Sequence, residues 1–264
     1  MKIVNLGSGS KGNCTVVASD NTTILIDAGL PILEIEAKLN SLGIDPINIS
    51  GILVTHEHID HIKSLGKLSK KYHIPVYAHI SEWPVLETKA KDILPQSKHA
   101  FDNDFYIGDL TISAFGLSHD ANLCVGYSVY NAGAKFSIAT DLGCCPKDVI
   151  EKLKGSNLVL LEANHDENLL MNNAHYPLIL KKRIISNKGH LSNRQSAEVI
   201  SQLVGGTSQI LLGHLSEENN SPLLAYNTIK SLLAQKGIVE GEHIFIDVTY
   251  QHRISNIFEI KSSK

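Results

Sequence analysis

The segment VTHEHIDHIKSL, residues 54–65, places polar side chains directly after an apolar run. His56, His58, Asp60 and His61 all fall within six positions of it. Neutral imidazole and carboxylate groups are ordinary ligands of zinc, and of manganese or iron when oxygen donors are included. A solvated polar loop has no need for so many ligand-type side chains between an apolar strand and a helix. The spacing therefore predicts a metal site in which His56 and His58 face one ion, while Asp60 and His61 face a second.

Further candidate ligands follow apolar stretches elsewhere in the chain. These are His119 after ISAFGLS, Asp141 after FSIAT, His214 after QILLG and His190 in NKGHLSN. We predict that each lies where a strand passes into a loop, because catalytic groups tend to gather on such rims. Each one alone could be an ordinary polar residue with satisfied hydrogen bonds. Together with the first cluster they indicate one composite site.

The elements that must position these residues can be predicted along the chain. β-branched and apolar runs predict early strands at 2–6, 14–19, 22–29, 51–56 and 74–79. Helical spacing predicts helices at 32–43, where Gly43 would be the C-cap, and at 62–73. Residues 101–141 look rich in β-strands, with a hairpin turn at 131–135 (NAGAK). The later part alternates, with helices predicted at 146–155, 193–204 and 223–237, strands at 157–164, 209–216 and 243–248, and a polar loop before residue 193. This order predicts an α/β fold with two sheets and helices outside them.

Composition excludes some classes of protein. The chain has 264 residues, is 43% hydrophobic and carries a net charge of −3, so it can bury a core and is not a strongly basic nucleic-acid coat. A local basic groove stays open, because only the contacting cations matter for phosphate binding. No signal-type segment and no unbroken apolar run of roughly 18 residues is present, which predicts a soluble, cytoplasmic protein. The four cysteines form no CxxC pair and are predicted to be reduced.

The HxHxDH motif, followed by a distant His, Asp and His, resembles the metallo-β-lactamase superfamily. The resemblance covers essentially the whole chain as a single domain, residues 1–264, and implies a four-layer αββα sandwich. The resemblance also implies a site for two divalent metal ions, with one residue that binds both of them. The implied ligands are His56, His58 and His119 for the first ion, Asp60, His61 and His214 for the second, and Asp141 as the bridge. Two such ions, of zinc, manganese or iron, would stabilise a bridging hydroxide as the nucleophile and clamp a phosphoryl group, and Asp60 could also orient the hydroxide.

His190 is the residue that indicates which branch of this superfamily the chain resembles. In the phosphodiesterases similar to RNase Z and PhnP, a histidine at about this place sits near the leaving group. The resemblance implies that His190 protonates the departing oxygen or stabilises phosphoryl charge, and the alternative is a supporting or surface histidine. Glu162, after a buried strand, could contact His190 or a ligand histidine, as carboxylates around metal sites do. His165 and Asp166 are further candidates.

Several segments are similar to the YycJ/WalJ group, among them NLGSGSKGNCT, LEANHDENLL, LGHLSEENN and DVTYQHRIS. This resemblance implies a 5′-to-3′ exonuclease that acts on double-stranded DNA. Lys182 and Arg183 could contact its backbone phosphates, or could form a solvated basic face. The GSGSKGN loop is not a P-loop, because an asparagine follows its last glycine where lysine is required. Ser10, Lys11 and Asn13 of this loop could still contact a phosphate, or the loop could be a plain turn.

Two other functions stay open at this point. One is a small-molecule phosphodiesterase of the PhnP type, acting on a cyclic or simple diester. The other is a noncatalytic nucleic-acid-binding protein that kept the fold. Activity on bis(p-nitrophenyl) phosphate without activity on DNA would favour the first, and DNA binding without cleavage would favour the second. The complete set of ligand-type residues favours an enzyme.

Overall fold

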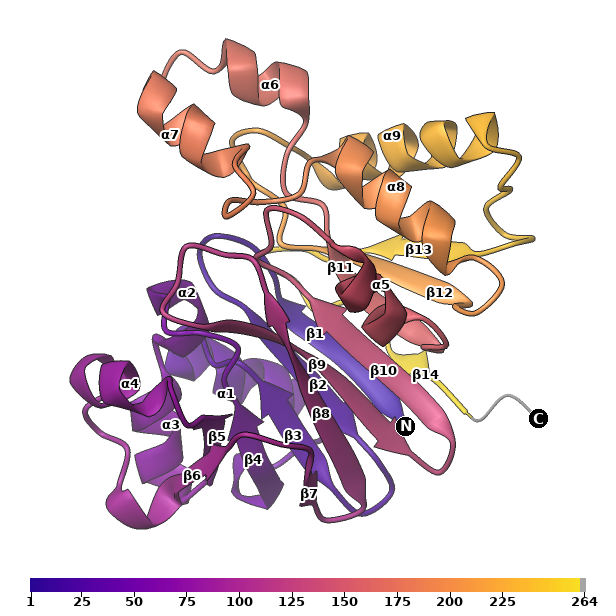
Figure 1. Ribbon diagram of the computed structural model, residues 1–264. Helices are drawn as coiled ribbons and strands as arrows, with labels where there is room; N and C mark the ends of the chain where they lie inside the picture. Colours follow the sequence, from indigo (N-terminus) through magenta and orange to yellow (C-terminus); the bar gives the residue numbers. More distant parts are fainter. Residues whose placement is uncertain (262–264) are drawn as a thin grey trace.

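A computed structural model of the protein describes residues 1–261. Within this range the chain forms two seven-stranded sheets, with helices on their outer faces (Figure 1). The first sheet has the order β14-β1-β2-β3-β4-β5-β6. Its strands are β1 (Lys2–Gly7), β2 (Cys14–Ala18), β3 (Thr23–Ile26), β4 (Ile49–Leu53), β5 (Val76–His79), β6 (Lys98–Phe101) and β14 (Phe258–Glu259).

The second sheet has the order β13-β12-β11-β10-β9-β8-β7. Its strands are β7 (Phe105–Ile107), β8 (Leu110–Leu117), β9 (Cys124–Asn131), β10 (Ala134–Ala139), β11 (Leu158–Glu162), β12 (Gln209–Gly213) and β13 (Phe245–Val248). In each sheet a run of parallel pairs follows antiparallel ones: β3 to β6 in the first sheet and β10 to β13 in the second. Parallel strands point their carboxyl ends at one edge, where side chains from distant parts of the sequence can meet.

Helices pack on the outer face of each sheet, which gives the predicted four layers. Apolar side chains of α1 (Ile32–Ser41), α3 (Leu65–Tyr72) and α4 (Trp83–Lys89) join the first sheet in one buried cluster. Those of α5 (Lys147–Leu153), α8 (Asn193–Leu203) and α9 (Pro222–Gln235) join the second sheet in another. The αββα prediction is confirmed.

The facing surfaces of the sheets form the central core. Ile3 and Ile24 from the first sheet and Tyr127, Phe136 and Leu160 from the second belong to a third buried cluster. Burying a side chain of this size stabilises the fold by about 1.5–3 kcal/mol relative to leaving it exposed. This core fixes the position of one sheet relative to the other, and therefore also the relative positions of the loops at their edges.

The helix predicted at 62–73 is two helices, α2 (Ile59–Ile62) and α3. Ser64 separates them, because its backbone N–H donates to the Ala28 carbonyl oxygen at 2.8 Å instead of continuing the helical pattern. Its hydroxyl also donates to the carbonyl oxygen of Leu30 at 2.6 Å. The break between the two helices thus lets Ser64 hydrogen-bond to the loop after β3.

The prediction of a polar loop before residue 193 was wrong, since this segment contains α6 (Glu167–Asn172) and α7 (Leu178–Ile184). Asp166 caps α6 by accepting hydrogen bonds from the backbone N–H groups of Asn168 and Leu169, both at 3.0 Å. None of the seven residues of α7, all of them described, is buried. Its apolar residues therefore do not follow a core-facing pattern, and periodicity could not reveal the helix.

Two predicted turns agree with the structure. Gly43 has φ of 71° just after α1, and the turn between β9 and β10 places Ala132 and Gly133 at positive φ, as a tight hairpin requires. Cys14, Cys124, Cys144 and Cys145 are all free thiols. Among residues 1–261, no helix has the length and apolar character needed to cross a membrane.

Candidate functional site

The predicted ligands meet at the carboxyl edge of the two sheets. His56 lies shortly after β4, His119 after β8, Asp141 after β10 and His214 directly after β12. These positions agree with the predicted strand ends. His190 differs, because it lies between α7 and α8 and follows no strand.

Three acidic or histidine residues at these strand ends have an unusual backbone. The φ angles are 63° for Asp27, 63° for Asp141 and 54° for His214, all in the left-handed region. Residues other than glycine rarely adopt this conformation, which costs about 1–3 kcal/mol, and it persists where the surroundings enforce it, often at functional sites. All three side chains contact the cluster described next, so the strained turns form part of the site.

The first ligand group consists of His56, His58 and His119, whose candidate ligand atoms lie within 4.8 Å of one another. Their ring centroids are 4.6 to 5.2 Å apart. His119 Nδ1 lies 3.1 Å from the Gly189 carbonyl oxygen, which can only accept, so Nδ1 carries the proton and Nε2 keeps a free lone pair. His56 Nε2 is buried and has no hydrogen-bond partner among residues 1–261. A buried nitrogen without a partner is costly unless a metal ion occupies its lone pair.

The second group consists of Asp60, His61 and His214, whose candidate ligand atoms also lie within 4.8 Å of one another. His61 Nδ1 lies 2.7 Å from Asp27 Oδ2, and His214 Nδ1 lies 2.7 Å from Glu162 Oε1. Such carboxylates fix the tautomer and leave Nε2 available as a ligand. His214 Nε2 is also buried, and it lacks a hydrogen-bond partner within the described part of the chain.

Asp141 lies between the two groups. Its Oδ2 is 3.2 Å from His61 Nε2, and its Oδ1 is 3.7 Å from His119 Nε2. Asp141 is therefore placed to contact one ion in each group. This is the arrangement expected of a bridging carboxylate.

The charges of the site favour cations. Burial alone would raise the pKa of Glu162, but the charges and hydrogen bonds of His190 and His214 lower it to about 2. Burial alone would lower the pKa of His214, but Asp141, Asp60 and Glu162 raise it to about 10. The buried carboxylates thus attract positive charge strongly, which divalent ions can supply. The mixed nitrogen and oxygen donors suit zinc, manganese or iron, so the residues present fit a pair of metal ions.

The loop that carries the HxHxDH motif is shaped by segments of the first sheet. A Cβ atom on Gly29 would lie 1.6 Å from the Asp60 carbonyl oxygen, so only glycine allows this approach. The Asn13 backbone N–H donates to that same oxygen at 2.8 Å, and the Ala28 N–H donates to the His61 carbonyl oxygen at 2.8 Å. The loop conformation is therefore held by residues far away in sequence.

His190 borders the cluster. Its Nδ1 lies 2.9 Å from Glu162 Oε1, and its ring centroid lies 5.1 Å from that of His119 and 5.3 Å from that of His214. The prediction that Glu162 contacts His190 or a ligand histidine is confirmed for both His190 and His214. The His190 side chain is 20% exposed and faces a cavity of about 270 Å³. A substrate in this cavity can reach His190.

His190 also belongs to a group compact enough to hold a metal ion, together with Asp141, Glu162 and His214. Geometry alone therefore permits His190 to be a metal ligand.

The predicted substrate-binding residues lie in different surroundings. Ser10 and Arg183 line the same cavity as His190, and Arg183 forms an ion pair with Asp120. Lys11 Nζ lies 2.6 Å from Glu217 Oε2, beside a neighbouring cavity that Asp60 also lines.

Asn13 and Lys182 do not line the His190 cavity. Asn13 is buried: its side-chain oxygen accepts from the Gly9 N–H at 2.9 Å, and its nitrogen lies 3.1 Å from His61 Nε2. It therefore lies within the wall of the cluster. Lys182 is exposed on α7.

The remaining candidates have structural contacts. Asp166 caps α6, and burial lowers the pKa of His165 to about 4. Two residues that contact the site were missed, namely Asp27 and Asp120, the latter 3.4 Å from His119 Nε2. Asp27 lies inside the strand predicted at 22–29, but it directly follows the apolar run TILI, which is the observed β3, so the strand-end rule used for Asp141 could have found it.

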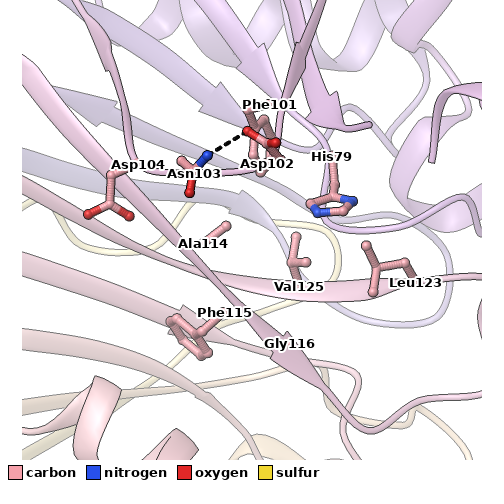
Figure 2. Close-up of a pocket in the computed structure, with 10 residues that line it drawn as sticks. All are labelled: His79, Phe101, Asp102, Asn103, Asp104, Ala114, Phe115, Gly116, Leu123 and Val125. Carbon is pink, nitrogen blue, oxygen red and sulfur yellow. Dashed lines mark hydrogen bonds between the residues drawn. The ribbon is translucent and has the colours of Figure 1, made fainter. Parts of the chain in front are cut away.

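A larger cavity, of about 590 Å³, lies elsewhere (Figure 2). Figure 2 shows His79, Phe101 and Phe115 in its lining, and a hydrogen bond between Asn103 and Asp102. The Asn103 side-chain nitrogen donates to Asp102 Oδ1 at 2.7 Å. None of its lining residues belongs to the ligand groups. The cavities that border the ligand groups are smaller ones, lined by His190 in one case and by Asp60 in another.

Comparisons with known proteins agree with this geometry. Residues 22–215 match a family described as the beta-lactamase superfamily domain. The chain is 37% identical over 240 residues to the exodeoxyribonuclease YycJ of Bacillus anthracis, covering 90% of each chain. It is 36% identical over 241 residues to the exodeoxyribonuclease WalJ of Streptococcus pneumoniae, covering 89% of each. The metallo-β-lactamase fold protein YhfI of Bacillus subtilis superposes with a TM-score of 0.72 at 16% identity, over 96% of this chain and 98% of that one. This chain is therefore an enzyme of the metallo-β-lactamase superfamily, similar to YycJ and WalJ and equipped with His/Asp clusters suited to metal ions.

Proposed function

We propose that the protein is a metal-dependent exonuclease that removes nucleotides from the 5′ ends of double-stranded DNA. The observation that carries this proposal is the pair of ligand groups joined at Asp141, with His190 beside them at a cavity open to substrate. The exodeoxyribonucleases YycJ and WalJ, similar over most of the chain, support DNA as the substrate.

In this proposal His56, His58 and His119 would hold one ion, Asp60, His61 and His214 would hold another, and Asp141, which lies between the two groups, would contribute to both. When bound, the two ions would activate a water molecule and neutralise the charge of a phosphodiester. Asp60 orients the attacking water through its second carboxylate oxygen. His190, which lines the cavity beside the ligand groups, would donate a proton to the leaving oxygen. Glu162 holds the His190 ring by its Nδ1 atom, which leaves Nε2 for that transfer.

The proposal is tested with duplex DNA labelled at either the 5′ or the 3′ end. With added manganese, the 5′ label should leave as a short product from the first turnovers, while the 3′-labelled strand shortens stepwise. A chelator should stop both reactions. Early loss of the 3′ label instead would contradict the direction, and uniform internal cleavage would contradict the exonucleolytic mode.

A small phosphodiester is the second candidate substrate, because the cavity beside His190 holds only about 270 Å³. This is slightly below the usual range for small-molecule sites, of about 300–1,000 Å³. Bis(p-nitrophenyl) phosphate and DNA should therefore be compared with one enzyme preparation. Turnover of the small diester alone would favour this second function.

We expect His190→Ala to keep its metal ions while kcat on DNA falls by about a hundred-fold, the usual contribution of a general acid. Metal content by mass spectrometry and single-turnover hydrolysis would check this. His99→Ala, which removes an exposed histidine from β6, is the matched control. Loss of one metal equivalent from His190→Ala would contradict the acid role and make His190 a ligand.

We expect Lys182→Ala and Arg183→Ala to weaken DNA binding and to reduce its dependence on salt concentration, because each removes a cation that can contact phosphate. Binding of a labelled duplex to enzyme with calcium in place of the active metal, measured over a series of salt concentrations, provides the slope. Lys91→Ala, at an exposed lysine after α4, controls for the loss of charge alone. Slopes equal to that of the wild type would place the two side chains away from the substrate.

A further inference from the structure

Residues 166–189, which include α6 and α7 and are here named the arm, project beyond the second sheet (Figure 1). The base of the arm is fixed to the site. Gly189 accepts a hydrogen bond from the ligand histidine His119, Asn187 accepts one from the Ser118 hydroxyl at 2.8 Å, and the Asp166 N–H donates to Asn219 at 2.9 Å. The arm therefore has a defined position beside the metal groups.

The helix α7 has two different faces. Leu180, Arg183 and Ile184 follow helical spacing and line the His190 cavity. Leu178 and Ile179, together with Ile185 at the end of the helix, are 60%, 84% and 49% exposed. These three apolar side chains, here named the outer face, surround Lys182. Such a grouping on a surface usually marks a contact with a partner.

Charge and position favour DNA as the partner of the outer face. Lys181, Lys182 and Lys188 lie on or next to α7, so a polyanion is attracted to this part of the arm. The opposite face of the same helix lines the cavity that holds His190. A helix with its side chains is about 10 Å across, which is about three base steps of DNA. The outer face and the cavity beside His190 therefore lie on opposite sides of one helix, about the width of three base steps apart.

We infer that α7 separates the strands of duplex DNA, with the attacked strand passing along the inner face and the outer face packing against the end of the remaining duplex. Architectural DNA-binding proteins insert Leu and Ile side chains between base steps and thereby unstack them, and unstacking the end of a duplex is the first step of separating its strands. The inference rests on the proposed nuclease function. It accounts for exposed apolar residues beside a site that is too small to admit two strands.

The test is the double variant Leu178→Ser/Ile179→Ser, whose two positions are exposed and so leave the core unchanged. Hydrolysis rates are compared on a blunt duplex, on a duplex with an unpaired 5′ end and on a single strand. We expect a fall of about ten-fold or more on the blunt duplex, since unstacking then lacks its wedge. Rates on the two unpaired substrates should match those of the wild type.

The control is Ile47→Ser, since Ile47 is 66% exposed in the short helix before β4, at the end of the sheet away from the site. Equal slowing on all three substrates, or an unchanged rate on the blunt duplex, would overturn the inference while leaving the nuclease function standing. Two further measurements compare the wild type with the double variant: light scattering for a dimer, and binding to anionic vesicles. A dimer or vesicle binding that only the wild type shows, without a substrate-dependent defect, would overturn the inference and assign the outer face to a second copy or to a membrane. If the wild type cleaves bis(p-nitrophenyl) phosphate and none of the DNA substrates, the nuclease function fails and the inference fails with it.

Discussion

The His58→Ala variant is expected to lose about one metal equivalent per chain and to hydrolyse DNA about a thousand-fold more slowly than the wild type. His58 lies 4.6 Å from His56 and 5.1 Å from His119, measured between ring centroids, and without it only two imidazoles remain in that group. An ion that polarises a phosphoryl oxygen supplies several kcal/mol of transition-state stabilisation, and each 1.36 kcal/mol corresponds to about a tenfold rate. Metal analysis and hydrolysis of labelled duplex in the same samples measure both effects.

His58 is more suitable for this test than His56, because His56 is fully buried and its removal would also leave a cavity. The fold of His58→Ala should therefore remain intact, as judged by circular dichroism of the metal-free proteins. His99→Ala again serves as the control for loss of a histidine. Full activity in His58→Ala would mean that the first ligand group does not take part in the reaction.

Glu162→Gln is expected to weaken metal binding by about 10- to 100-fold and to lower thermal stability, although Glu162 is not proposed as a ligand. Its carboxylate accepts hydrogen bonds from His190 and His214 and from the backbone N–H of Leu191 at 2.9 Å. A glutamine amide would turn an N–H group toward one of these donors and would remove a buried negative charge. Breaking a buried charged pair costs about 3–5 kcal/mol.

Competition with a metal-sensitive dye measures the first effect, and the melting temperature of the metal-free protein measures the second. Glu151→Gln, at an exposed glutamate on α5, is the matched control. Since Glu162 contacts both His190 and His214, Glu162→Gln should combine the slow hydrolysis of His190→Ala with weakened metal binding. Unchanged stability and metal affinity would show that the hydrogen bonds of Glu162 do not hold these histidines.

The residues of the two ligand groups could be singled out from sequence because they follow a local rule, and the structure brings them together. The HxHxDH motif places four donors in one turn, and strand ends such as that before Asp141 are visible as apolar runs. Parallel strands then bring these ends together without any further information from the sequence. The same rule would have found Asp27, but its short strand carries no neighbouring histidine to draw attention to it.

Other features depend on contacts that sequence does not reveal. The requirement for glycine at position 29 arises from its approach to Asp60, which is remote in sequence. Asp120 lies 3.4 Å from His119 Nε2 and also forms an ion pair with Arg183 of α7, which is remote from it in sequence. The arm itself was predicted as a polar loop, since no residue of α7 is buried and the helix therefore shows no core-facing period. These features depend on contacts between residues that are remote in sequence, and local sequence patterns do not reveal such contacts.

The most direct test of the two-metal account is a titration of the metal-free enzyme with manganese. Bound metal and release of 5′-labelled nucleotide from duplex DNA are measured in the same samples. The account predicts no hydrolysis without metal and a maximal rate only once both ligand groups are filled, with about two ions bound per chain. Hydrolysis by the metal-free enzyme, or a maximal rate reached with about one ion per chain, would contradict it.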